Sequence, residues 1–217
     1  MSNITWNNEV KDFWVSEINK HQRAGNFDQS CRLKDGKGNF FACLMNSNQN
    51  NMLGVASKRL DIPFWLVDLS STIFEHLPKE ASERFPVELF ESIPVDADLT
   101  DLFYRVILKR LEAIDARYYG ALSVIRDALT NHSTVDWSVI WTITDNAATR
   151  ASRVRDDHSM VLHLAHSITV HCKSQGSWGV YYMCDAVKRF AGSEGYWERE
   201  RDVLLALLEE VSLEPVC

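Results

Sequence analysis

Apolar residues recur along most of this 217-residue chain with the three-to-four-residue spacing of amphipathic helices. The first stripe begins at Trp6, includes Phe13 and Trp14, and stops before Gly25, a residue typical of helix ends. The last stripe lies in residues 196–211. The same spacing fills most of the sequence between them, and it predicts a mainly α protein.

Between these two stripes, proline and aspartate residues suggest where helices begin. Pro63 and Pro86 suit the first turn of a helix because proline fixes φ and needs no amide partner there. Asp98 suits an N-cap. We expect one internal helix that ends at Leu60, two over residues 63–76 and 86–92, and one that follows Asp98. We expect a further one that ends near Leu129, one that begins near Ser133, and two over residues 154–174 and 178–191. We therefore expect about eight or nine helices.

The chain shows no strand–helix alternation, no internal repeat and no linker, so we expect a single compact helical domain over residues 1–217. One short segment departs from the helical pattern. Asp35 and Gly36 lie between two short apolar runs, and an Asp-Gly pair in that setting is typical of a tight turn between strands. The sequence thus also predicts a small β-hairpin near residues 30–44.

The chain is acidic, with 23 Lys and Arg residues against 30 Asp and Glu residues, a net charge of −7. This balance disfavours direct nucleic-acid binding and attachment to anionic membranes. The first residues lack the basic and apolar regions of a secretion signal, and no apolar run is long enough to span a bilayer. The five cysteines include no Cys-x-x-Cys pair. We expect a cytoplasmic protein with reduced thiols.

The negative charge is local. Residues 68–101, here called the acidic segment, hold nine acidic and two basic residues, and residues 194–217, the acidic tail, hold seven and two. Such runs usually form a solvated face, but they also suit docking of a basic partner. The partner-binding residues that we predict are Glu75, Glu80, Glu83, Glu88, Glu91, Asp96 and Asp101.

Motifs for catalysis or metal binding are scarce. His158, His163, His166 and His171 share one expected helix, but at about 100° per residue they fan around it instead of converging. Only His163 and His166 could share a ligand, and they would need a carboxylate from another helix. The usual hydrolase, phosphate-binding and di-iron motifs are missing. We predict no catalytic residue and no cofactor.

A second feature is a small basic patch. Arg150 and Arg153 are three residues apart. We expect them to pair with acidic groups of the same molecule, and the alternative is that they bind phosphate.

Several short motifs then occur in order: Leu60-Asp61-Ile62-Pro63, Ile73-Phe74-Glu75, Leu77-Pro78, Phe85-Pro86 and Ile93-Pro94-Val95-Asp96-Ala97-Asp98-Leu99. This series resembles an uncharacterised family of bacterial, phage and prophage helical proteins and covers about a quarter of the chain. The family has glycine where this chain has Asp61, His76 and Asp96. The resemblance implies turn positions and a mobile-element origin, and it assigns no site residue.

Together these observations favour a non-enzymatic interaction protein. We expect its acidic surface to bind and inhibit a host protein that has a basic surface and that functions in defence or in nucleic-acid processing. The alternative is an enzyme or metal-binding helical protein that uses His163 and His166 with a carboxylate from another helix. A third possibility is a structural or self-assembling role. The sequence leaves open the partner, the oligomeric state, and whether the acidic segment and the acidic tail meet.

Overall fold

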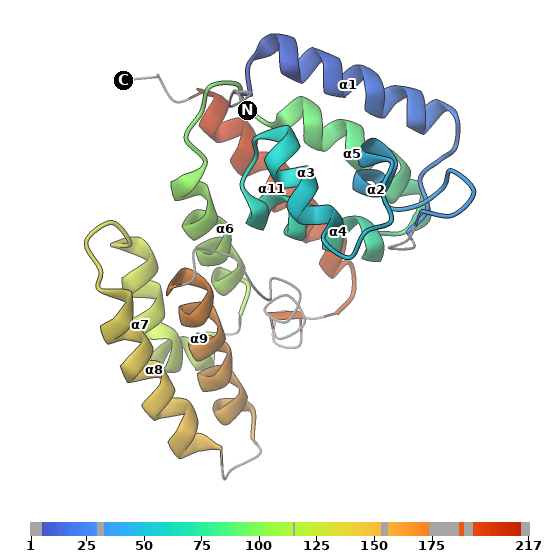
Figure 1. Cartoon of the computed structure of the whole chain (residues 1–217). Helices are drawn as coiled ribbons and strands as arrows, with labels where there is room; N and C mark the ends of the chain where they lie inside the picture. Colours follow the sequence, from blue (N-terminus) through green and yellow to red (C-terminus); the bar gives the residue numbers. More distant parts are fainter. Residues whose placement is uncertain are drawn as a thin grey trace. The chain divides into compact units, whose positions relative to one another are not determined.

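The computed structural model in Figure 1 describes residues 6–29, 33–114, 116–152, 156–173, 187–188 and 193–213. Within these ranges the chain forms ten α-helices and one 3-10 helix, with two isolated backbone bridges in place of strands. The expected mainly α fold is confirmed. None of the described helices is both long and apolar enough to cross a membrane.

The contacts between residues gather in two compact units. Unit 1 comprises residues 1–102 and 197–217, and unit 2 comprises residues 103–196. Unit 1 holds 21 acidic and 12 basic residues, a net charge of −9, whereas unit 2 holds 9 and 11, a net charge of +2. The single domain over residues 1–217 stays a prediction.

The helices of unit 1 come from both ends of the chain (Figure 1). They are α1 (Asn8–Arg23), α2 (Phe40–Met45), α3 (Met52–Leu60), α4 (Phe64–His76), α5 (Lys79–Ser92) and α11 (Tyr196–Leu213). The helix α6 (Thr100–Glu112) begins where unit 1 gives way to unit 2. Unit 2 contains the 3-10 helix η1 (Ala116–Tyr118), α7 (Tyr119–Thr130), α8 (Trp137–Ala151) and α9 (Asp157–Lys173).

The core of unit 1 is built around α2, all six residues of which are buried. The ring of Phe40 lies 4.1 Å from that of Phe41 and 5.2 Å from that of Phe74, measured between centroids. Phe85 and Phe90 of α5 approach Phe40 edge-on at 6.4 Å. Edge-to-face contacts of this kind are favourable because the positive ring edge meets the negative ring face. The aromatic cluster holds α4 and α5 in place around α2.

Asn39 fixes the start of α2 and is completely buried. Its Oδ1 accepts a hydrogen bond from the backbone N–H of Phe41, at 3.0 Å. Its Nδ2 donates to Oγ of Ser71 at 2.9 Å and to Oε1 of Glu75 at 3.0 Å. A single side chain therefore caps one helix and ties it to α4.

Several expected elements appear at the expected places. Helix α1 begins after Asn7, whose Oδ1 accepts from the N–H of Val10, and it is followed by Gly25 with φ +65°. Asp98 caps the start of α6, because its Oδ1 accepts from the N–H of Thr100 at 2.8 Å. Phe13, however, is 55% exposed, although it belongs to the apolar stripe of the first helix.

The helix expected over residues 86–92 begins seven residues earlier in the structure. Helix α5 starts at Lys79, so Pro86 lies in its interior instead of its first turn. Pro78 provides the fixed φ at the actual start, and burial of Phe85, Leu89 and Phe90 outweighs the backbone hydrogen bond lost at Pro86.

The expected hairpin is only partly present. Lys34 and Lys37 exchange two backbone hydrogen bonds around the predicted turn, where Gly36 has φ +78°. The expected second strand is instead helix α2, because burial of its whole apolar run in the core favours a helix capped by Asn39. Residues 30–32 of the expected first strand lie outside the described residues.

Two aspartates of the short motifs, Asp61 and Asp96, have a left-handed backbone. Asp61 has φ +54° and Asp96 has φ +53°, the region that glycine adopts at lowest cost. Aspartate tolerates this region better than most other side chains. Asp61 directly follows α3 and Asp96 lies in the loop after α5, so both residues belong to turns.

In unit 2, α9 packs against both α7 and α8. Thr144 of α8 donates from Oγ1 to Oγ1 of Thr169 on α9, at 3.3 Å within the buried interface. The ring of Tyr104 stacks on Trp137 at 5.8 Å and on His132 at 4.2 Å. Of the expected helix over residues 178–191, all but residues 187 and 188 lie outside the described part of the chain.

Candidate functional site: an acidic groove of α5 and α11

Helix α5 separates its charged and apolar residues sharply. At about 100° per residue, Glu80, Glu83, Glu88 and Glu91 fall within one arc of the helix together with Arg84. The opposite side buries Phe85 and Leu89 in the core of unit 1. Because the aromatic core determines which side faces inward, it also determines that the predicted glutamates of this helix face outward.

Helix α11 presents a second polar stripe. Asp202, Leu205, Glu209 and Ser212 recur at spacings of three and four residues, so they lie along one side of the helix. Leu204, Leu207 and Leu208 on the neighbouring side are buried. Helix α11 thus uses these three leucines for packing and leaves Asp202 and Glu209 exposed, whereas Glu200 is buried.

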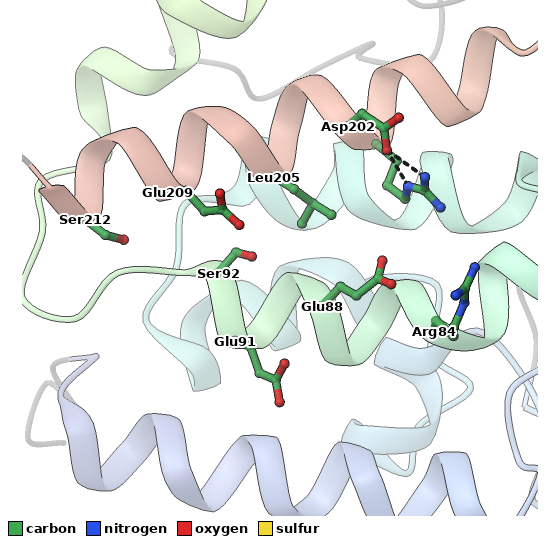
Figure 2. Close-up of a pocket in the computed structure, with 9 residues that line it drawn as sticks. Arg84, Glu88, Glu91, Ser92, Asp202, Leu205, Glu209 and Ser212 are labelled. Atoms are coloured by element: carbon green, nitrogen blue, oxygen red, sulfur yellow. Dashed lines mark hydrogen bonds and ion pairs between the residues drawn. The ribbon is translucent and has the colours of Figure 1, made fainter.

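These two stripes line a groove of about 810 Å³ within unit 1. Figure 2 shows α5 and α11 side by side, with Glu88 and Glu209 on the two walls and Leu205 pointing into the groove from α11. The lining residues are Arg84, Glu88, Glu91, Ser92, Arg201, Asp202, Leu205, Glu209 and Ser212. From Asp202 to Ser212 the wall is about 15 Å long at 1.5 Å per residue. The acidic segment and the acidic tail therefore meet in space.

The charges of the groove are only partly neutralised. Arg201 donates to Oδ1 of Asp202 from Nε at 2.8 Å and from Nη2 at 2.6 Å. Across the described residues, the carboxylates of Glu88, Glu91 and Glu209 make no ion pair. Four carboxylates against two guanidinium groups leave a net charge of −2 on the lining. The groove thus attracts cations and retains carboxylates able to bind them.

Lys11 of α1 supports the far side of the groove. Its Nζ donates to the backbone carbonyl oxygens of Glu91 at 2.6 Å and Ile93 at 2.9 Å. Burial lowers the pKa of Lys11, while the nearby charges of Glu91 and Asp12 act in the opposite direction. A cation at the end of α5 also satisfies carbonyl groups that a helix leaves without partners. Lys11 therefore fixes the segment that carries Glu91.

The remaining predicted partner-binding residues do not join the groove. Glu75 is half-buried on α4, and its Oε1 accepts hydrogen bonds from Asn39 and from Ser71. Asp96 is exposed in the loop after α5, and its N–H donates to the carbonyl of Trp6. Asp101 is exposed in the first turn of α6. Glu75 thus serves the fold, whereas the other two lie on different parts of the surface.

Glu80 and Glu83 are exposed near the start of α5. Glu83 lines a separate hollow of about 500 Å³, together with Asp28, Lys37, Lys79 and Arg84. Three cations and two carboxylates line this hollow, so it does not favour a cationic ligand. The acidic groove differs because carboxylates outnumber the cations on its walls.

Seven of the nine lining residues were not among the predicted site residues, and the three that matter most for the groove are Asp202, Leu205 and Glu209 of α11. Two signals pointed toward them, namely the charge of the acidic tail and the spacing of residues 202, 205 and 209 along one side of the last helix. Neither signal could show that this side faces α5.

The histidines of α9 do not form a shared site. His158 and His163 are exposed, His171 is buried, and Nε2 of His166 lies 3.7 Å from Oδ1 of Asp145 on α8. A carboxylate from another helix does approach His166, as the alternative function requires. Nevertheless, no three metal-ligating side chains in the described ranges are close enough together to hold a metal ion.

Comparisons with models of known protein families, with curated proteins and with solved structures found no match to this chain.

Proposed function

We propose that this protein binds another protein through the acidic groove of α5 and α11 and recognises a basic segment there. The observation that supports this proposal is the meeting of the acidic segment and the acidic tail on two facing helices. Three of the groove's four carboxylates make no ion pair with the described residues, so a partner's lysine and arginine groups could replace water around them. Leu205 gives the aliphatic stem of such a side chain an apolar surface to cover.

The dimensions of the groove suit a short segment. A wall of about 15 Å matches four or five residues of an extended chain, or about ten residues of a helix. Basic residues at spacings of three and four along a helix would face Glu88 on one wall and Glu209 on the other. Electrostatic attraction of this kind accelerates association and makes it sensitive to salt.

We further propose that the partner is a host protein of defence or nucleic-acid processing and that binding inhibits it. The resemblance to phage and prophage proteins supports the choice of a host target. Host proteins that contact nucleic acid expose basic surfaces, and such surfaces complement an acidic groove. Covering such a surface would block its access to nucleic acid. Inhibition in this proposal needs no catalysis by the chain itself.

The experiment is affinity capture from bacterial lysate at low and high salt, followed by mass spectrometry. The test variant is Glu88→Lys/Glu209→Lys, which reverses one carboxylate on each wall of the groove. The control variant is Glu9→Lys/Asp127→Lys, which makes the same change in net charge at two exposed positions that do not line the groove.

We expect the test variant to lose the captured protein by about tenfold or more, and the control variant to retain it. Equal retention by both variants would exclude the groove as the binding site. Equal loss in both would assign capture to overall charge. For a captured nucleic-acid enzyme, the activity measured with and without the chain then tests inhibition.

A further inference from the structure

Helix α8 of unit 2 carries an apolar stripe that the described helices of this unit leave exposed. Thr144 and Ala148 are buried on the side toward α9. Val139 and Ile143, four residues apart, are 52% and 45% exposed. These are among the most exposed large apolar side chains of the described residues, and they lie on the same side of one helix.

Opposite charges flank this stripe at equal distances. Asp136 precedes Ile143 by seven residues and Arg150 follows it by seven, so both lie on the same side of the helix as Ile143. Oδ1 of Asp136 accepts from the N–H of Ser138 at 2.8 Å and caps α8. The exposed Arg150 makes no ion pair with any described residue, and Arg153, the other arginine for which we expect internal pairing, lies outside the described residues.

We propose that α8 is a self-association surface on which a second copy of this chain docks its own α8 in the antiparallel direction, with the twofold axis at Ile143. This arrangement places Asp136 of each copy beside Arg150 of the other, so one complementary pair closes each end. Val139 of each copy faces Ala147 of the other. A large residue opposite a small one lets two helices approach to about 8–10 Å.

The charges also select the direction of pairing. Parallel helices in register would place Asp136 against its own copy and Arg150 against its own copy, and both contacts are repulsive. In the antiparallel arrangement both contacts are attractive. The two copies use the same surface, as a twofold interface requires.

The flanking residues are consistent with a small interface. Ser138, Thr142 and Thr149 are exposed and polar on one border of the stripe. One helix face buries less than the 1,200–2,000 Å² or so that is usual for stable complexes. We therefore expect a weak dimer that forms at high protein concentration.

Sedimentation equilibrium of the full chain, from about 1 μM to about 1 mM, measures this association. We expect the mass to rise from 24.9 kDa toward twice that value. Ile143→Glu should keep the protein monomeric. Arg150→Glu should raise the dimerisation midpoint at least about tenfold at low salt, because the introduced carboxylate would face Asp136 of the other copy. The control Thr142→Glu adds an exposed acid to the same helix outside the stripe and should dimerise like the unaltered protein.

Disulfide cross-linking tests the position of the axis. Ile143→Cys should form cross-linked dimers under mild oxidation well above the level of the unaltered protein. Val139→Cys should not, because antiparallel pairing separates the two copies of residue 139 by about 12 Å along the helix. A monomer at every concentration would overturn the proposal. A dimer that Ile143→Glu leaves intact, or one that cross-links better at residue 139, would overturn it equally.

Discussion

Asn39→Ala should destabilise unit 1 more than any other single change of a helix cap in the described structure. The side chain of Asn39 is fully buried and makes three hydrogen bonds, to Phe41, Ser71 and Glu75. Loss of the cap costs about 1 kcal/mol. Leaving the Phe41 N–H without a partner in the core and the half-buried Glu75 carboxylate with one partner fewer adds about 1–3 kcal/mol.

The expected loss is therefore about 3 kcal/mol, a large share of a typical stability of about 5–15 kcal/mol. Urea denaturation followed by circular dichroism and tryptophan fluorescence measures it. The matched control is Asn7→Ala, which removes a half-buried cap with one hydrogen bond, to Val10, and should cost about 1 kcal/mol. If Asn39→Ala costs no more than Asn7→Ala, the assigned role of Asn39 is wrong.

Asn39→Asp distinguishes lost capping from lost donation. The aspartate can still accept from Phe41, but it cannot donate to Glu75, and it places a second carboxylate close to that group. Two such carboxylates resist joint ionisation. We expect this variant to be more destabilised at pH 7 than at pH 4, where one of them binds a proton. A loss of stability that is independent of pH would contradict the contact with Glu75.

Three further predictions concern single groups. Burial, with a smaller effect of the Glu75 charge, raises the pKa of Asp68 to about 6. The folded state therefore binds the proton of the Asp68 carboxyl more tightly than the unfolded state does, and the protein loses stability as the pH rises from about 4 to 6. Asp68→Asn should remove that loss and raise the free energy of unfolding at pH 7 by up to about 2 kcal/mol but little at pH 4, as urea titrations at both pH values will show. Burial also raises the pKa of Cys43 to about 11 and raises that of Cys172 still further. Both thiols should therefore react with iodoacetamide far more slowly in the folded protein than in urea, and mass spectrometry of the alkylated protein measures the two rates. Asp98→Ala should cost about 1 kcal/mol, measured by thermal unfolding, because it removes the cap of α6.

The sequence by itself determined the helical class, most helix boundaries and the location of the charge. Apolar spacing, the Asp98 cap and the glycine after α1 act within a few residues, so they can be recognised without knowledge of the rest of the chain. The same local signals were misleading at Pro86 and in the Asp35-Gly36 hairpin. There, burial in the core of unit 1 outweighed the local preference.

Only the tertiary structure decided which charged residues can bind a partner. Glu75 and Glu88 belong to the same acidic segment, yet packing turns Glu75 toward Asn39 and leaves Glu88 in the groove. Glu209 comes to the opposite wall although more than a hundred residues separate it from Glu88 in the chain. Helical spacing defines the sides of each helix, but contacts between distant segments decide which sides are covered, and those contacts leave no periodic trace in the sequence.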